Sequence, residues 1–337
     1  MKKFLFFVIS VFMLCFFVAC SNEDECGYSE KISCSLNNEN YDLLKKKVDS
    51  ISNYYLQNSG SIQTRKNILE YVRDKKIQNL ADNAGRVVGG YIGKNVGVVI
   101  GSAGTPLGGI MGYVVGKGLG QFFGSITASF VAYRIIEKYF SYRANLPSRD
   151  SSVFYYLPDS CYDNNDSIGY YHNLVMYELV KNGDKYDLDD GNFNYNMIYD
   201  DCLSYLLQYG AFDNCKKDFF IACRADFKYD IISYVKITSG LSDDFIGGKI
   251  DELTYQSRFI ESIDDYNLTD EERLAFCDYA MQLSEICSQL SYEANIQYAE
   301  DLNHEISHSN ISDELKNELR STTNMIVNSS IFYDMVK

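Results

Sequence analysis

Polar and apolar positions divide the chain into regions of clearly different pattern. Behind Lys2 and Lys3, the residues from Phe4 to Val18 are uncharged and predominantly apolar, and the polar, turn-forming residues 21–40 follow. The apolar run is shorter than the ~20 residues that a membrane-spanning helix needs, and it follows a basic start. This pattern predicts a cleaved signal peptide over residues 1–19 and a flexible tether over residues 20–40.

Helical periodicity begins at Tyr41. Apolar residues then recur at spacings of three and four on Leu44, Val48, Ile51 and Tyr55, and again on Ile68, Leu69, Val72 and Leu80. Such spacing is typical of amphipathic helices, which we expect over residues 41–83 with a kink near residues 59–61. Residues 138–160, with Pro147 and Pro158, are expected to form a linker, and residues 161–337 a helical domain.

Helix start and stop signals in the last region indicate short connections between helices. Gly183 and Gly210 are expected to end helices that begin near Tyr170 and Tyr195. Ser242, Thr269 and Ser312 are expected N-caps, and Thr269 with Glu272 forms a capping box for one long helix that extends through Tyr298. The sequence therefore predicts an all-α fold, with a helical hairpin followed by a C-terminal α-helical bundle.

Glycines dominate residues 84–137. More than half of the chain's 23 glycines lie here, and two series advance in steps of four: Gly85, Gly89, Gly93, Gly97 and Gly101, then Gly104, Gly108, Gly112, Gly116, Gly120 and Gly124. Glycine at every fourth position gives a helix a smooth groove into which another backbone fits closely. Since each glycine inside a helix costs about 1 kcal/mol relative to alanine, such a helix needs lipid or close packing to stabilise it.

This segment resembles the glycine-zipper two-helix domain of bacterial envelope proteins, a resemblance that implies an architecture and no activity. Three arrangements are compatible with the pattern: a hairpin inserted in a membrane with its turn at Gly104-Thr105-Pro106, the buried core of a folded domain, or an oligomeric pore. Lys94 and Lys117 interrupt the two arms, and a lysine at mid-bilayer costs about 2.5–3.5 kcal/mol. A homo-oligomer stays an open alternative.

The residues Phe17-Val18-Ala19-Cys20 are similar to the lipobox of bacterial lipoproteins, which implies that Cys20 is acylated after cleavage. Phe17 departs from the usual leucine. The following Ser21 resembles the outer-membrane sorting choice, and residues 23–25 are similar to the acidic surface-export signal of Bacteroidetes lipoproteins. The resemblance implies an outer membrane lipoprotein that faces outward from the cell. An acidic linker without a role in export is the alternative for residues 23–25.

Composition limits the partners of the chain. The formal net charge of −15 argues against a nucleic-acid partner, because such binding depends on clustered lysine and arginine. Neither Gly93-Lys94 nor Gly116-Lys117 follows a glycine at the spacing of a phosphate-binding loop, so no nucleotide is expected either. The expected partner is the membrane, reached through Cys20 and through the glycine-zipper hairpin.

Of the ten cysteines, eight remain once Cys15 is cut away with the signal peptide and Cys20 is acylated, and an even set in an exported chain suggests disulfide bonds. Cys26 with Cys34 is the local pair that the sequence favours. Cys277 and Cys287 lie ten residues apart in a helical pattern, about 15 Å along the axis, and are expected not to bridge each other.

Residues 167–173 contain an Ile-Gly-x-x-His-Asn pattern that resembles a signature of uncharacterised Bacteroidetes exported lipoproteins, some of which also carry glycine zippers. The resemblance transfers no activity. We interpret His172 and Asn173 as a buried hydrogen-bonding pair.

His304-Glu305-Ile306-Ser307-His308 matches the H-E-x-x-H pattern of zinc peptidases, in which both histidines bind zinc and the glutamate activates a water. Polar flanking residues and the absence of a further histidine at 314, which is Glu314, argue against the match. The remaining candidates for a third ligand are Glu314 and Glu318. A second apparent metal site, an EF-hand-like run over residues 187–192, places Tyr186 and Leu188 where carboxylates are needed and is interpreted as a turn.

These expectations favour a structural or interaction role without catalysis and without a cofactor. A secreted membrane-perturbing toxin, supported by the glycine zipper, is one alternative. A zinc metallopeptidase that uses His304, Glu305 and His308 is the other.

Overall fold

A computed structural model describes residues 39–58, 68–102, 106–140, 146, 155–158, 167–188, 192–211 and 214–336. All of them belong to the unit that covers residues 34–337. This part of the chain is all-α, as the sequence predicts. In chain order its elements are α2 (Glu39–Asn58), α3 (Ile68–Ser102), α4 (Pro106–Phe140), α5 (Ile168–Lys181), η1 (Gly183–Tyr186), α6 (Tyr195–Gln208), α7 (Asn214–Ile246), α8 (Glu252–Glu261), α9 (Asp270–Leu274), η2 (Ala275–Ala280), α10 (Met281–Gln289), α11 (Tyr292–His308) and α12 (Asp313–Val336).

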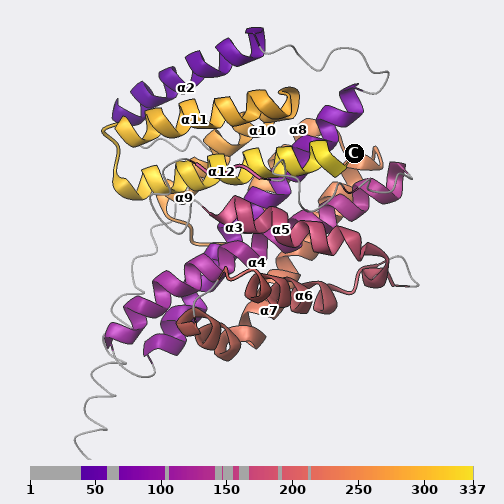
Figure 1. Ribbon diagram of the computed structural model, residues 1–337, viewed down its shortest axis with the longest axis vertical. Coiled ribbons are helices and arrows are strands. Elements are labelled where there is room, and N and C mark those ends of the chain that lie inside the picture. Colours follow the sequence, from indigo (N-terminus) through magenta and orange to yellow (C-terminus); the bar gives the residue numbers. More distant parts are fainter. Residues whose placement is uncertain are drawn as a thin grey trace, which may run out of the picture. The chain divides into compact units, whose positions relative to one another are not determined.

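The antiparallel hairpin of α3 and α4 lies at the centre of these helices (Figure 1). Helices α7, α10 and α12 pack on α3, and α5, α6 and α7 pack on α4. Large side chains of α4 such as Phe123, Phe130 and Tyr133 are fully buried. The expected boundary between residues 83 and 84 lies inside the continuous helix α3, because the glycine-rich segment extends the preceding helix without a break.

Helix α2 forms an outer layer on α11 (Figure 1). Its apolar stripe is buried, as the periodicity from Tyr41 predicts. Polar bonds tie the two layers at several points: Ser52 shares a hydrogen bond of 2.8 Å with Tyr298, and Tyr55 donates to Asp301 at 2.8 Å. The amphipathic segment thus covers the C-terminal helices.

Local signals set several helix ends where the sequence places them. Gly210 adopts the left-handed conformation, with φ of 72°, directly after α6. Thr269 and Glu272 form both bonds of the capping box at the start of α9, and Ser312 accepts from the backbone N–H of Leu315 at the start of α12. Such bonds satisfy backbone donors that a helix leaves open at its first turn.

Two expected boundaries are wrong. Ser242 lies inside α7, where its hydroxyl donates to the carbonyl of Thr238 at 3.1 Å instead of capping a helix. The expected long helix from Thr269 ends at Gln289 and restarts at Tyr292. The Asn295 side chain donates to the carbonyls of Cys287 and Leu290 at 3.1 and 3.3 Å, so a side chain takes the place of helical backbone bonds at this break.

None of the described helices combines the length and the hydropathy that crossing a bilayer requires.

Candidate functional site

The glycines of α3 and α4 face each other along the hairpin. Gly85, Gly89, Gly93 and Gly97 lie opposite Gly124, Gly120, Gly116 and Gly112, respectively. A methyl group added to Gly89 would lie 2.9 Å from the carbonyl carbon of Gly120 and closer still to its oxygen. Backbone lies against backbone at each of these levels, so no side chain fits between the two helices. The groove that the glycine series forms is therefore filled within the same chain.

Five charged side chains surround the middle of this hairpin. Lys94 contacts Glu272 at 3.1 Å, Lys117 contacts both Glu272 and Glu318 at 2.9 Å, and Arg86 contacts Glu318 at 3.0 Å. The two glutamates come from α9 and α12, far away in sequence, and both are buried. The cluster neutralises the two lysines that interrupt the glycine-rich arms.

The electrostatics of this cluster favour the charged forms. Burial alone would raise the pKa of Glu318, but Arg86 and Lys117 lower it to about 2. For Glu272, burial again opposes ionisation, while Lys117 and the backbone N–H of Thr269 hold its pKa below the usual range. The pKa of Lys117 is raised because its two carboxylate partners outweigh its burial. Removal of Glu318 would leave the buried Arg86 without its counter-charge, and removal of Glu272 would do the same to the buried Lys94.

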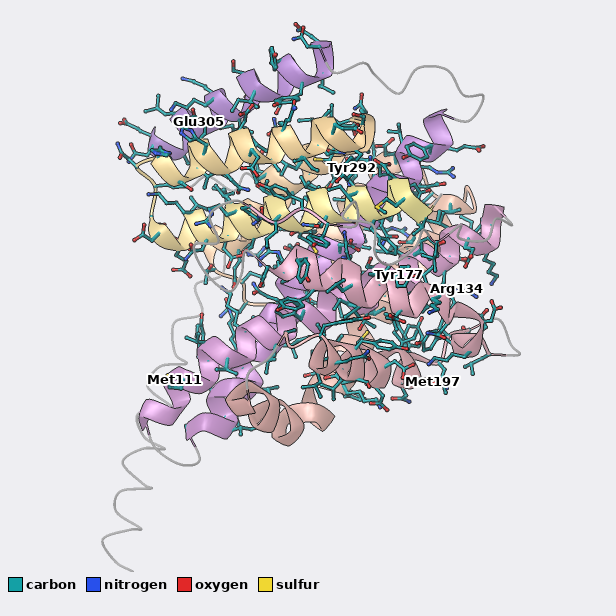
Figure 2. The ribbon with its side chains drawn as sticks, in the orientation of Figure 1. Met111, Arg134, Tyr177, Met197, Tyr292 and Glu305 are labelled. Carbon is teal, nitrogen blue, oxygen red and sulfur yellow. The ribbon has the colours of Figure 1, made fainter. Side chains whose placement is uncertain are left out.

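Beyond this cluster the hairpin has no charged residues and several of its apolar side chains are exposed. We call residues 95–102 and 106–116 the tip, and residues 77–94 and 117–136 the base. The sequence contains no Asp, Glu, Lys or Arg from residue 95 to residue 116. Val99, Met111 and Val114 of the tip are 71%, 61% and 63% exposed, although they are apolar. The tip extends beyond α5, α6 and α12, one end of α7 lies beside it, and Met111 lies at its far end (Figures 1 and 2).

The Ile-Gly-x-x-His-Asn residues lie at a crossing of three helices. Gly169 of α5 packs so closely on α12 that an added methyl group would lie 2.6 Å from the carbonyl oxygen of Asn324. Asn173 donates to the carbonyl of Asn328 at 2.9 Å and lies 3.0 Å from Nδ1 of its neighbour His172. Nε2 of His172 lies 3.3 Å from the carboxylate of Asp82 on α3. His172 and Asn173 are fully buried, so the pattern forms part of the core.

The H-E-x-x-H residues lie at the end of α11. His304 and His308 are exposed and stack with ring centroids 4.2 Å apart, whereas Glu305 forms an ion pair with Lys47 of α2 at 2.6 Å (Figure 2). Glu318, considered as a third ligand, belongs to the buried charge cluster. No group of three or more His, Cys, Asp or Glu side chains with metal-binding geometry occurs among the residues that the structure describes.

The predicted cysteines and the EF-hand-like run differ in how much of them the structure describes. Cys20, the cysteines Cys26 and Cys34, and Gly104 lie outside the described residues. Cys202 and Cys287 have buried free thiols, and burial raises the pKa of Cys287 to about 12. At the EF-hand-like run, Asp187 pairs with Phe193 in an isolated antiparallel bridge and with Arg134 in an ion pair.

Sequence reasoning missed the role of Glu272 and Glu318. Each is separated from its lysine partners by more than 150 positions, so no local spacing could have indicated the pairing. The available signal was weak: two lysines in an otherwise apolar, glycine-rich hairpin require counter-charges wherever they are buried.

Comparison with known proteins returned no relationship: no protein family, curated protein or solved structure matches this chain.

Proposed function

We propose that this protein is a lipid-anchored protein of the bacterial outer membrane that inserts the tip of its glycine-zipper hairpin into one leaflet of the bilayer. Its role is structural or interactional. The observation that carries the proposal is the charge-free, exposed tip that begins where the buried charge cluster ends.

The chemistry of the tip suits a hydrocarbon environment. Val99, Met111 and Val114 gain on the order of 1–2 kcal/mol each when their exposed surface leaves water, since full burial of such a side chain is worth about 1.5–3 kcal/mol. The backbone of α3 and α4 is hydrogen-bonded within each helix, which is the condition for entering lipid. Even the hydroxyl of Ser102 donates to the carbonyl of Val98 in its own helix, at 2.5 Å.

The dimensions suit one leaflet. From Lys94 to Ser102 the helix rises about 12 Å at 1.5 Å per residue, and the hydrocarbon core of one leaflet is about 15 Å deep. The charged cluster at Lys94 and Lys117 marks the depth limit, because charged groups resist entry into hydrocarbon. The acyl chains expected on Cys20 would hold the protein at the same membrane, and two weak anchors together give stable attachment.

A single tryptophan reports this insertion cleanly, because the chain contains none. The full chain with Cys20→Ala, which removes the acyl anchor, would carry either Val99→Trp in the tip or Leu253→Trp on α8, a residue 78% exposed and outside the hairpin. Both proteins are mixed with phospholipid vesicles that contain lipids brominated at defined depths. We expect a blue-shifted, bromine-quenched emission for Val99→Trp alone. Equal emission of the two proteins with and without vesicles would refute the insertion.

Attachment through Cys20 has a separate test. Cells that express the wild type or Cys20→Ala are fractionated, extracted with carbonate and shaved with protease. We expect Cys20→Ala to be released by carbonate, since the shallow tip alone binds weakly, whereas the wild type stays in the membrane fraction and is cut by external protease. A wild type that is released by carbonate would contradict the acyl anchor.

A further inference from the structure

A cavity lies between α4, α7 and the segment that joins η1 to α6. Its volume is about 750 Å³, within the range of small-molecule sites. Lys138 and Ile135 of α4 line one side, and Lys236, Ser239, Gly240 and Asp243 line the other from one face of α7. The cavity is separate from the hairpin tip and from the charge cluster, so it requires a different explanation.

Two lysines give the cavity a local positive charge in a strongly acidic chain. Among the described residues, neither Lys138 nor Lys236 forms an ion pair with a carboxylate. By contrast Arg134, one turn before Lys138 on α4, is engaged by Glu137 and Asp187 (Figure 2). Asp243 is the one carboxylate among the described lining residues, and it lies 3.6 Å from Lys249. Within the described part of the chain, the two lysines are thus available to an anionic ligand.

Two aromatic rings form the third wall. Phe193 and Tyr195 lie with ring centroids 6.2 Å apart, nearly perpendicular to each other. The hydroxyl of Tyr195 shares a hydrogen bond of 3.2 Å with Ser239, which fixes its ring against α7. The ammonium of Lys236 lies 5.4 Å from the centroid of the same ring. The two rings therefore meet edge to face, with the Lys236 ammonium over Tyr195 and the Phe193 ring as the apolar surface beside it.

Gly240 is the lining residue without a side chain. It lies within α7 on the face that lines the cavity. A methyl group at this position would meet no atom within 4 Å, so packing does not require a glycine here. A larger side chain would therefore project into open space, which makes Gly240 a suitable position for testing the site.

We propose that this cavity binds a sugar acid of the uronate type. The carboxylate would bind Lys138 and Lys236, because ammonium groups form strong, charge-assisted hydrogen bonds with carboxylates. The C–H face of the sugar ring would pack on Phe193. Its hydroxyl groups would bond to Asn192, Ser239 and Asp243, the polar groups of the lining.

Isothermal titration of the full chain in detergent tests the proposal with sodium glucuronate, glucose and sodium acetate as probes. We expect saturable binding of glucuronate, and affinities for glucose and acetate lower by about tenfold or more, since each probe lacks one of the two recognition elements. An absence of saturable glucuronate binding would overturn the proposal. So would equal affinity for glucose, because the lysines would then play no part.

Two variants locate the site. Lys236→Met keeps the length of the side chain and removes its charge, and it should weaken glucuronate binding by about tenfold. Gly240→Leu should project into the cavity beside Lys236 and weaken binding. The matched control is Lys181→Met, because Lys181 also lies over a tyrosine ring, that of Tyr177 at 6.0 Å, but outside the cavity (Figure 2). Thermal unfolding verifies that each variant folds. If Gly240→Leu fails to fold, Lys236→Met still tests the site, because Lys236 is exposed. An unchanged glucuronate affinity of Lys236→Met would overturn the assignment of the ligand to this cavity.

Discussion

The base and the tip of the glycine-zipper hairpin share one repeat and differ in almost everything that surrounds it. At both ends the glycines lie backbone to backbone, at Gly89 and Gly120 in the base and at Gly97 and Gly112 in the tip. In the base, other helices cover the outer faces of the pair. In the tip, Val96, Ile100 and Val115 are partly buried, but part of the outer surface carries exposed Val99, Met111 and Val114.

The difference shows that the glycine series sets the distance between the two helices but does not determine the environment of their outer faces. That environment depends on the residues between the glycines and on the counter-charges that other helices supply. In the base, Arg86, Lys94 and Lys117 receive partners from α9 and α12, so the charges are buried within the fold. In the tip no charge exists to be partnered. A single hairpin is therefore both a protein core and an apolar projection.

The largest effect is expected from a substitution in the charge cluster of the base. Glu318→Gln removes one of the two carboxylates that face Arg86, Lys94 and Lys117, and removal of one partner of a buried ion pair typically costs about 3–5 kcal/mol. We expect the free energy of unfolding to fall by about 3 kcal/mol in urea titrations. The control is Glu305→Gln, which breaks the more exposed ion pair with Lys47 and should change stability by less than about 1 kcal/mol. Equal effects of the two variants would contradict a special role of the cluster.

The ionisation of Glu318 should also make the stability of the protein depend on pH. The pKa of Glu318 is about 2 in the folded protein, below the value of an ordinary glutamate. A carboxyl group whose pKa is lowered by folding stabilises the folded state above its unfolded pKa, and this stabilisation is lost as the pH falls through the folded pKa. The wild type should therefore lose stability between about pH 4.5 and pH 2 more steeply than Glu318→Gln. Parallel curves for the two proteins would show that Glu318 does not titrate in this way.

The next effect concerns the tip alone. Val99→Asp places a charge on the exposed apolar surface, and a charge in hydrocarbon costs up to about 2.5–3.5 kcal/mol. We expect vesicle binding of the Cys20→Ala chain to weaken by about tenfold to a hundredfold in flotation assays, with the free energy of unfolding in water unchanged within about 0.5 kcal/mol. Ile237→Asp, on an exposed apolar residue of α7, is the control and should leave binding unchanged. A similar loss in both variants would indicate a general effect of charge.

The sequence predicted the local part of this picture. The four-residue glycine spacing indicated that two backbones meet, and local capping at Thr269 and Gly210 indicated helix ends, because each depends on neighbours within a few positions. The pairing of Lys94 and Lys117 with Glu272 and Glu318 depends on long-range packing and could not be read from spacing. The helix break at Leu290 was missed because the apolar period continues across it, although Ser291 is a local signal: its hydroxyl accepts from the backbone N–H of Ala294 and caps α11.

The candidate sites were less predictable than the fold. His304, Glu305 and His308 match a catalytic pattern in one dimension, but a zinc site also needs a third ligand and a glutamate that is not engaged elsewhere. Glu305 instead contacts Lys47. The cavity beside Tyr195 left no pattern at all, because its walls come from three separate segments.

A smaller effect tests the close packing in the base. Gly89→Ala would place a methyl group against the backbone of Gly120, with the carbonyl carbon at 2.9 Å, and the surrounding helices prevent the pair from separating. Overpacking costs typically 1–3 kcal/mol, and alanine returns up to about 1 kcal/mol of helix propensity. We expect a net loss of about 1–2 kcal/mol in urea unfolding. Gly97→Ala in the tip should cost less, because that end of the hairpin can open slightly. The reverse order would contradict the distinction between base and tip.

The smallest expected effect is a stabilisation, and it compares two kinds of glycine within the single helix α4. Gly118 of α4 lies between Gly116 and Gly120, yet a methyl group there would meet no atom within 4 Å. Gly118→Ala should therefore stabilise the protein by about 0.5–1 kcal/mol, because alanine favours the helix and restricts the unfolded chain. The measurement is the same urea titration. If Gly118→Ala destabilised the protein as much as Gly89→Ala, any loss of a glycine would be destabilising. The glycines spaced four residues apart would then not be distinguished by their contact with the other helix.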